Sequence, residues 1–200
     1  MDHYYSAMPD VASDPKSVQY RVLGMNFTCT TDSGVFCRDG LDMGTRILLE
    51  ALPETLGDDL LDLGCGWGPV GIALGKKYPQ ARIVMSDVNA RAVALAQKNC
   101  AANGVHNAQT VTGDAFENIE GAFSAIVLNP PIRAGKAVIY ALFEQAKAHL
   151  TADGALYIVM RKQQGAESAQ RYLQSLYATV ERISRDKGYW VLRCSGGIKE

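Results

Sequence analysis

Short apolar runs alternate with amphipathic stretches over most of this 200-residue chain. Mostly apolar runs of about four to eight residues, bounded by polar or glycine-rich segments, are typical of strands that are buried on both faces. We expect such strands at residues 59–63, 81–86, 109–112, 124–128 and 155–160.

Between these runs, apolar residues recur every three or four positions, as they do on the buried face of a helix. This spacing predicts helices over residues 89–102, 136–150 and 164–178, and one between Asp42 and Pro53. The expected buried face of the second helix consists of Val138, Leu142, Ala146 and Leu150. The alternation predicts an α/β fold with a Rossmann-like, doubly wound sheet whose strands are mostly parallel.

Both ends of the chain depart from this alternation. Residues 180–185 and 189–194 predict an antiparallel hairpin at the C-terminal end, which gives a sheet of about seven strands. Residues 20–31 predict a smaller hairpin that turns at Gly24. We therefore expect an N-terminal extension with a hairpin over residues 1–40 and the main domain over residues 41–200.

Composition excludes several classes of protein. No apolar run approaches the roughly 20 residues needed to cross a bilayer, and the first residues do not resemble a signal peptide. We therefore expect a cytoplasmic protein with no membrane partner. Its five scattered cysteines form no C-x-x-C pair, so we expect free thiols and no metal.

The net charge of −1 argues against a generally basic nucleic-acid-binding surface, but the charge is unevenly distributed. Residues 161–200 carry eight Lys or Arg residues against four Asp or Glu residues. Two interpretations stay open: an ordinary solvated surface, or a local basic rim that attracts phosphate.

A glycine-rich loop follows the first of the predicted buried strands. Asp62 lies at the end of that strand, and the loop consists of Gly64, Cys65, Gly66, Trp67 and Gly68. Glycines let backbone N–H groups approach a ligand closely. The dinucleotide pattern G-x-G-x-x-G is also present at residues 66–71, with Asp87 about twenty residues later. The loop alone therefore fits NAD as well as S-adenosylmethionine.

Two observations favour S-adenosylmethionine. The glycine run begins one step early, after Asp62, whose carboxylate could face the amino group of a methionine moiety. The sequence also has no Tyr-x-x-x-Lys pair for hydride chemistry. Asp87 would then accept from the ribose hydroxyls, unless it only caps the next helix, a role that Asn89 could also fill. Asp114 would meet the adenine amino group, with Phe116 beside the ring, unless it is an ordinary turn residue.

A second motif, Asn129-Pro130-Pro131-Ile132, follows a later strand. The lone pair of an exocyclic amino nitrogen is conjugated into its ring, so this nitrogen is a poor nucleophile. The side-chain oxygen of Asn129 and the carbonyl of Pro130 could accept its two N–H groups and hold it in line with the methyl group. The alternative is a strand that simply ends at two prolines.

Three further residues follow this motif closely and could meet the substrate. Ile132 could pack on the face of a base, and Arg133 and Lys136 could meet phosphate. Lys136 could equally be an ordinary solvated residue at the start of a helix.

The chain resembles the methyltransferase small family of class I S-adenosylmethionine-dependent methyltransferases. The likeness lies in the glycine loop and in residues 3–6, 34–36, 41–45, 87–89 and 129–136. Within the family, it is most similar to the catalytic half of enzymes that make N2-methylguanine in ribosomal RNA. The resemblance implies that Thr45, Val88, Ala115 and Asn129 contact the cofactor and that Phe36 lines the substrate entrance. It implies ribosomal RNA or the small ribosomal subunit as partner, and a monomer or homodimer.

Ile132 departs from the pattern of many base methyltransferases, which have an aromatic residue at this position to stack on the flipped base. Four alternatives to guanine-N2 methylation therefore stay open. They are adenine-N6 methylation, N-methylation of a protein glutamine, methylation of a small molecule, and cofactor binding without turnover in a partner subunit. A glutamine carboxamide nitrogen poses the same chemical problem as a base amino group.

Overall fold

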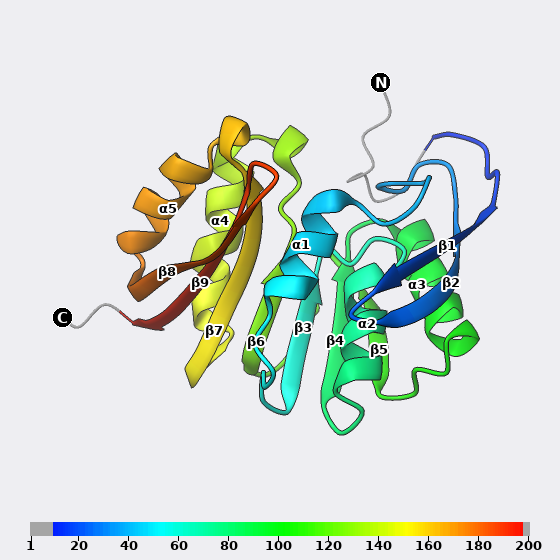
Figure 1. The fold of residues 1–200 in the computed structure, drawn as a ribbon, viewed down its shortest axis with the longest axis horizontal. Helices are drawn as coiled ribbons and strands as arrows, with labels where there is room; N and C mark the ends of the chain where they lie inside the picture. The colour runs from blue at the N-terminus through cyan, green and yellow to red at the C-terminus, as the bar shows by residue number, and fades with distance from the viewer. Residues whose placement is uncertain (1–9, 198–200) are drawn as a thin grey trace.

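The computed structural model describes residues 10–197 and contains a seven-stranded sheet with the order β5-β4-β3-β6-β7-β9-β8 (Figure 1). Its strands are β3 (Asp59–Leu63), β4 (Arg82–Asp87), β5 (Ala108–Thr112), β6 (Phe123–Leu128), β7 (Leu150–Arg161), β8 (Tyr177–Asp186) and β9 (Tyr189–Gly197). The first five pair in parallel, and β9 pairs antiparallel with both β7 and β8. The predicted α/β fold with a C-terminal hairpin is confirmed.

Within residues 10–197, five α-helices cover the two faces of this sheet. They are α1 (Met43–Ala51), α2 (Pro69–Lys77), α3 (Ala90–Ala102), α4 (Lys136–Ala148) and α5 (Ala166–Gln174). The first three share one buried cluster with one face of the sheet, and the last two share another cluster with the opposite face. The result is the three-layer arrangement that a doubly wound sheet requires.

The N-terminal hairpin consists of β1 (Lys16–Val22) and β2 (Met25–Thr31), which pair antiparallel. It starts four residues earlier than the sequence predicts and turns at Gly24 as expected. Phe27 and Cys29 are buried in the same cluster as α1, α2 and α3. The hairpin therefore shares a core with the main domain, and the boundary near residue 40 stays a prediction.

Two polar residues cap helices that begin near the carboxyl edge of the sheet. The side chain of Asp42 accepts from the Thr45 N–H at 3.0 Å at the start of α1. The side chain of Asn89 accepts from two N–H groups at the start of α3. Asn89, rather than Asp87, therefore caps α3.

The buried face of α4 differs from the predicted one. Ile139, Leu142, Phe143 and Ala146 are the buried residues, whereas Val138 is 47% exposed. The prediction for Val138 was wrong because the apolar stripe starts one position later. Leu150 lies beyond the helix end, in β7, since α4 stops at Ala148.

The buried amide of Asn99 joins three segments that are distant in sequence. Its nitrogen donates to the carbonyls of Thr30 and Trp67 at 2.8 and 2.9 Å, and its oxygen accepts from the Thr30 N–H at 2.7 Å. Because Asn99 is 1% exposed, these bonds lie in a nonpolar setting that strengthens them. They fasten the hairpin and the glycine loop to α3.

The chain runs from β3 outward through β4 to β5, and then returns so that β6 pairs with the other side of β3. The strand order therefore reverses between β3 and β6. Leu63 at the end of β3 lies opposite Ser86 of β4 and Leu128 of β6. The next residues, Gly64, Asp87 and Asn129, therefore emerge side by side at the carboxyl edge. Such a switch point is where doubly wound sheets bind ligands.

Candidate functional site

A cavity of about 340 Å³ lies at this switch point. It is lined by Phe36, Leu63, Gly64, Gly66, Ser86, Asp87, Val88, Ala92, Gly113, Asp114, Ala115, Leu128, Asn129, Pro130, Pro131, Ala134, Val138 and Leu142. The ends of four neighbouring strands contribute to it, together with the loop before α1 and the start of α4. Its mostly apolar lining with a few polar groups is usual for a small-molecule site.

Ten of the residues predicted from sequence line the cavity: Phe36, Gly64, Gly66, Asp87, Val88, Asp114, Ala115, Asn129, Pro130 and Pro131. The remaining predicted residues are not part of the lining: Thr45, Asp62, Cys65, Gly68, Ile132, Arg133 and Lys136. Phe116 is also outside the lining, since it is buried and stacks on His149 with ring centroids 4.5 Å apart.

The glycine loop presents its backbone to the cavity. Gly64 and Cys65 both donate their N–H groups to the Ser86 carbonyl at 2.8 Å, which fixes the loop on β4. Gly64 and Gly66 have φ values of +72° and +55°, and a Cβ added to either would meet nothing within 4 Å. Larger residues would be strained at these positions and would project into open space beside the cavity.

Asp87 connects the loop to the start of α3. Its two carboxylate oxygens accept from the Gly66 N–H and the Asn89 N–H, each at 2.8 Å. Burial raises the pKa of this carboxyl above its ordinary value, against the opposing effect of these hydrogen bonds. A carboxylate has about four acceptor positions, so Asp87 can still accept from a ligand in the cavity.

Asp62 has a different position from Asp87. It is 2% exposed, and its Oδ2 accepts from the Gly71 N–H in the first turn of α2 at 2.8 Å. Burial raises its pKa to about 7, and the negative charge of Asp87 adds to this shift. The buried Asp62 carboxylate thus holds the first turn of α2, which follows the glycine loop. Its contact with a methionine amino group stays a prediction.

The raised pKa of Asp62 makes a testable prediction about stability. Its ordinary pKa is 3.8, so between about pH 4 and pH 7 the folded chain holds this proton more tightly than the unfolded chain. Raising the pH through this window therefore costs the native state stability, by at most about 1.4 kcal/mol per pH unit. In urea denaturation, Asp62→Asn should gain free energy of unfolding relative to the wild type between pH 5 and pH 8.

Asp39→Asn is the matched control, because Asp39 is exposed and Lys16 lowers its pKa, so that it is ionised throughout this pH range. Parallel pH profiles for Asp62→Asn and the wild type would show that Asp62 does not titrate as described.

The side-chain amide of Asn129 is held by two partners. Its nitrogen donates to Oγ1 of Thr45 at 3.0 Å and to Oδ2 of Asp42 at 3.2 Å. These bonds occupy both N–H groups of the amide, so its oxygen is the acceptor left for the cavity. The carbonyl of Pro131 accepts from the Ala134 N–H, whereas no backbone N–H within residues 10–197 donates to the Pro130 carbonyl.

Apolar side chains with substantial exposure gather at the mouth of the cavity. Phe36 is 36% exposed and Val138 is 47% exposed, and both line the cavity. The indole N–H of the buried Trp67 donates to the Phe36 carbonyl at 3.0 Å and holds this loop in place. Ile132, by contrast, packs against the buried cluster under α4. Phe36 is therefore an aromatic side chain in the cavity lining, whereas the residue after the two prolines is the aliphatic Ile132.

Some basic side chains belong to segments next to the cavity lining. Arg133 and Lys136 follow the proline motif and are exposed. Lys187 in the β8–β9 turn contacts the Met43 sulfur at 3.8 Å, and the backbone N–H of Lys162 donates to the Gly188 carbonyl. The turn and the start of α1 share the upper edge of the molecule in Figure 1.

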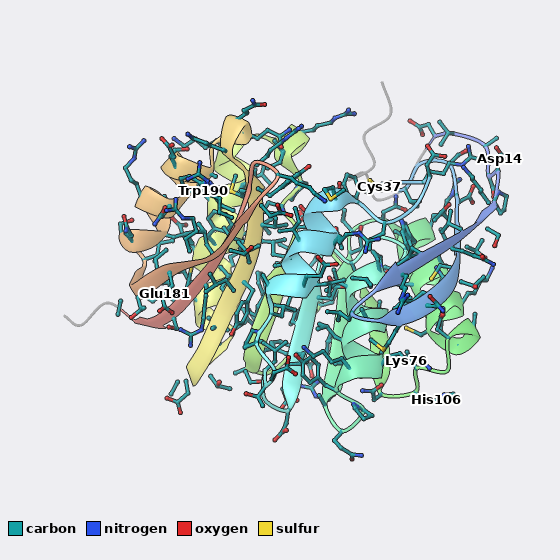
Figure 2. All side chains as sticks on the ribbon, viewed as in Figure 1. Asp14, Cys37, Lys76, His106, Glu181 and Trp190 are labelled. Atoms are coloured by element: carbon teal, nitrogen blue, oxygen red, sulfur yellow. The ribbon has the colours of Figure 1, made fainter. Side chains whose placement is uncertain are left out.

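Only part of the basic C-terminal stretch lies at this mouth. Arg193 pairs with Glu181 at 2.9 Å, and Figure 2 shows Glu181 far from the upper edge. Arg182 lies over the Trp190 ring at 4.3 Å. The two interpretations of the charge bias therefore stay open, and a phosphate-binding rim would involve only part of this stretch.

Metal binding, membrane-spanning helices and disulfides can be assessed only for the part of the chain that the structure describes. Within residues 10–197, no group of three His, Cys, Asp or Glu side chains could hold a metal ion. No helix in that range is long and apolar enough to cross a membrane. The five cysteines are free thiols.

Sequence reasoning missed the small and apolar members of the lining: Leu63, Ser86, Ala92, Gly113, Leu128, Ala134, Val138 and Leu142. Ser86, Gly113 and Leu128 are immediate neighbours of predicted residues at strand ends, and this position could have identified them. Val138 and Leu142 line the cavity from α4, and only the packing of that helix reveals them.

Known proteins resemble this chain over most of its length. The model of the methyltransferase small domain family matches residues 26–193. A Bacillus subtilis (strain 168) relative, the uncharacterized protein YbxB, is 42% identical over 196 residues, which cover 96% of this chain and 97% of YbxB.

Two solved structures are also similar. The T. thermophilus 16S rRNA N2 methyltransferase RsmC, in complex with AdoMet and guanosine, has a TM-score of 0.82 and 28% identity. The match covers 94% of this chain and 52% of RsmC, so the chain spans about half of that protein. The ribosomal protein L11 methylase of Lactobacillus delbrueckii has a TM-score of 0.67 at 20% identity, with 84% of each chain covered. This second likeness shows the fold alone.

Proposed function

This chain belongs to the methyltransferase small family, and on that premise we propose that it methylates the exocyclic N2 of a guanine in ribosomal RNA. It is a methyltransferase, and S-adenosylmethionine is the methyl donor of its family. The observation that carries the choice of an amino acceptor is the Asn129 amide, whose nitrogen is held by Asp42 and Thr45, which leaves its oxygen as the acceptor. This oxygen can accept from an amino group but cannot activate a thiol or a carbon acid.

The residues at the cavity fit the cofactor. The open space beside Gly64 and Gly66 leaves their backbone accessible to a methionine moiety. Asp87 would accept from the ribose hydroxyls, with Val88 beside it. Asp114 and Ala115 lie on the next loop along the sheet, where they would meet the adenine. S-adenosylmethionine supplies an electrophilic methyl group on a positively charged sulfur.

The chain's own residues would then position the acceptor. The Asn129 oxygen and the Pro130 carbonyl accept from the two N–H groups of the guanine amino nitrogen and direct its lone pair into the cavity. The nitrogen would gain the methyl group that the bound cofactor supplies, and its surplus proton would then leave to solvent. This is catalysis by positioning and requires no strong base.

Two features at the mouth support an RNA substrate. Phe36 is an aromatic side chain in the cavity lining and would contact a base that has been turned out of its strand. Arg133, Lys136 and Lys187 would meet the flanking phosphates. Ile132 would support the motif from beneath rather than touch the base. A ribosomal substrate would place the enzyme in the cytoplasm, and RsmC, which is 28% identical, has a related substrate.

Incubation with labelled S-adenosylmethionine and undermethylated small ribosomal subunits tests the proposal. Nuclease digestion and mass spectrometry of the nucleosides should then reveal N2-methylguanosine. N6-methyladenosine would instead identify adenine as the acceptor. Label in protein, or in no macromolecule while the cofactor still binds, would overturn the assignment to RNA.

Asn129→Ala separates the acceptor site from the cofactor site. Loss of the amide oxygen removes one of the two hydrogen bonds that hold the amino nitrogen, so kcat should fall by about 100-fold or more. The Kd of S-adenosylmethionine, measured by calorimetry, should stay within about twofold of the wild type. Losses of the same size in kcat and cofactor affinity would refute the role assigned to Asn129.

Lys136→Ala combined with Lys187→Ala tests the proposed RNA contacts. The KM for RNA should rise, and the slope of log KM against log salt should fall by about one to two because two phosphate contacts are lost. The affinity for S-adenosylmethionine should not change. Lys76→Ala is the control, since Lys76 lies at the far end of α2 (Figure 2). An unchanged salt slope in the double variant would place RNA elsewhere.

A further inference from the structure

We propose that Asp42 and Thr45 are positioning residues, which lock the Asn129 amide in the single orientation that turns its oxygen toward the acceptor. This inference rests on the proposed function, because it assigns the amide oxygen to an amino acceptor. Neither residue touches the acceptor; each acts through Asn129.

The three side chains form a closed triangle of hydrogen bonds. The Asn129 nitrogen donates to Oδ2 of Asp42 at 3.2 Å and to Oγ1 of Thr45 at 3.0 Å. The Thr45 hydroxyl in turn donates to the same Asp42 oxygen at 3.5 Å. Thr45 is 4% exposed, so water competes little for these bonds.

The chemistry of Asp42 determines which way the amide faces. An ionised carboxylate only accepts hydrogen bonds, so it must face the –NH₂ end of Asn129. A rotated amide would bring its oxygen against the carboxylate and would leave a donor in the acceptor site. The Thr45 hydroxyl uses its only hydrogen to donate to Asp42. Its oxygen can therefore only accept a hydrogen bond from Asn129. Both partners therefore select the same orientation.

The carboxylate is itself confined by its surroundings. Its Oδ2 also accepts from the Thr45 N–H at 3.0 Å as the cap of α1. A Cβ added to Gly44 would lie 2.9 Å from this oxygen and 3.0 Å from the Tyr189 ring. Because Gly44 has no Cβ, Tyr189 of β9 and the Asp42 carboxylate can pack closely against the start of α1. This packing leaves the Asp42 side chain little room to change its rotamer.

Asp42→Gly is the decisive variant because it removes the acceptor oxygen that holds Asn129. Glycine is tolerated at a helix N-cap, so α1 should persist and the Tm should fall only slightly. Without this oxygen the orientation of Asn129 is no longer enforced, so kcat should fall by about 10- to 100-fold. The KM for RNA and the Kd of S-adenosylmethionine should stay within about twofold.

Thr45→Val and Thr45→Ser form a matched pair. The valine variant lacks the hydroxyl and should lose kcat in the same way, whereas the serine variant retains it and should recover most of the turnover. In the Asn129→Ala background, Asp42→Gly should cause no further loss, because the positioned group is already absent. Asp39→Asn, an exposed acid paired with Lys16 nearby, is the control and should behave as the wild type.

The side-chain amide signals of Asn129 in a ¹⁵N-labelled sample provide a readout that needs no acceptor. Asn129→Ala identifies these signals, which should exchange slowly with solvent in the wild type and faster in Asp42→Gly. Full turnover in Asp42→Gly, additive losses with Asn129→Ala, or unchanged amide exchange would each overturn the inference. A wild type that methylates no amino acceptor would refute the proposed function, while the amide signals would still test the orientation.

Discussion

The placement of Leu63 between Ser86 and Leu128 is the constraint on which the whole site depends. Because all three strands run in parallel, this single register brings Gly64, Asp87 and Asn129 to one edge at the same level. These three residues are far apart along the chain, so contacts between sequence neighbours cannot bring them together. Burial of the two sheet faces under separate groups of helices stabilises the register, since a one-residue slip would reverse the orientation of every strand side chain.

Helix caps link this edge to the rest of the molecule. Asp42 caps α1 and also binds Asn129, while Asn89 caps α3 and also donates to the Gly34 carbonyl at 2.8 Å. Each such cap contributes about 1 kcal/mol to stability. Each also fixes a loop that borders the cavity, so the same polar atoms serve the fold and the arrangement of the site.

The periodicity of apolar residues predicted the fold well, because buried strands and amphipathic helices carry strong local signals. The glycine loop and the proline motif likewise identified two walls of the cavity. Val138 was misplaced, since one position decides whether a side chain in the first turn of α4 faces the core or the mouth. The Asn99 bonds and the Asp42–Asn129 contact were out of reach, because each joins segments that only the folded sheet brings together. The burial of Asp62 could not be predicted for the same reason.

Pro130 also affects the chemical lifetime of the amide beside it. Asparagine side chains commonly deamidate when the backbone nitrogen of the next residue attacks the amide carbon and closes a five-membered imide. The nitrogen of Pro130 has no hydrogen and belongs to a ring, so it cannot form this imide at Asn129. A carboxylate at residue 129 would lie 3.2 Å or so from that of Asp42 and would be repelled by it. The proline therefore protects, over the life of each molecule, a group that must remain uncharged.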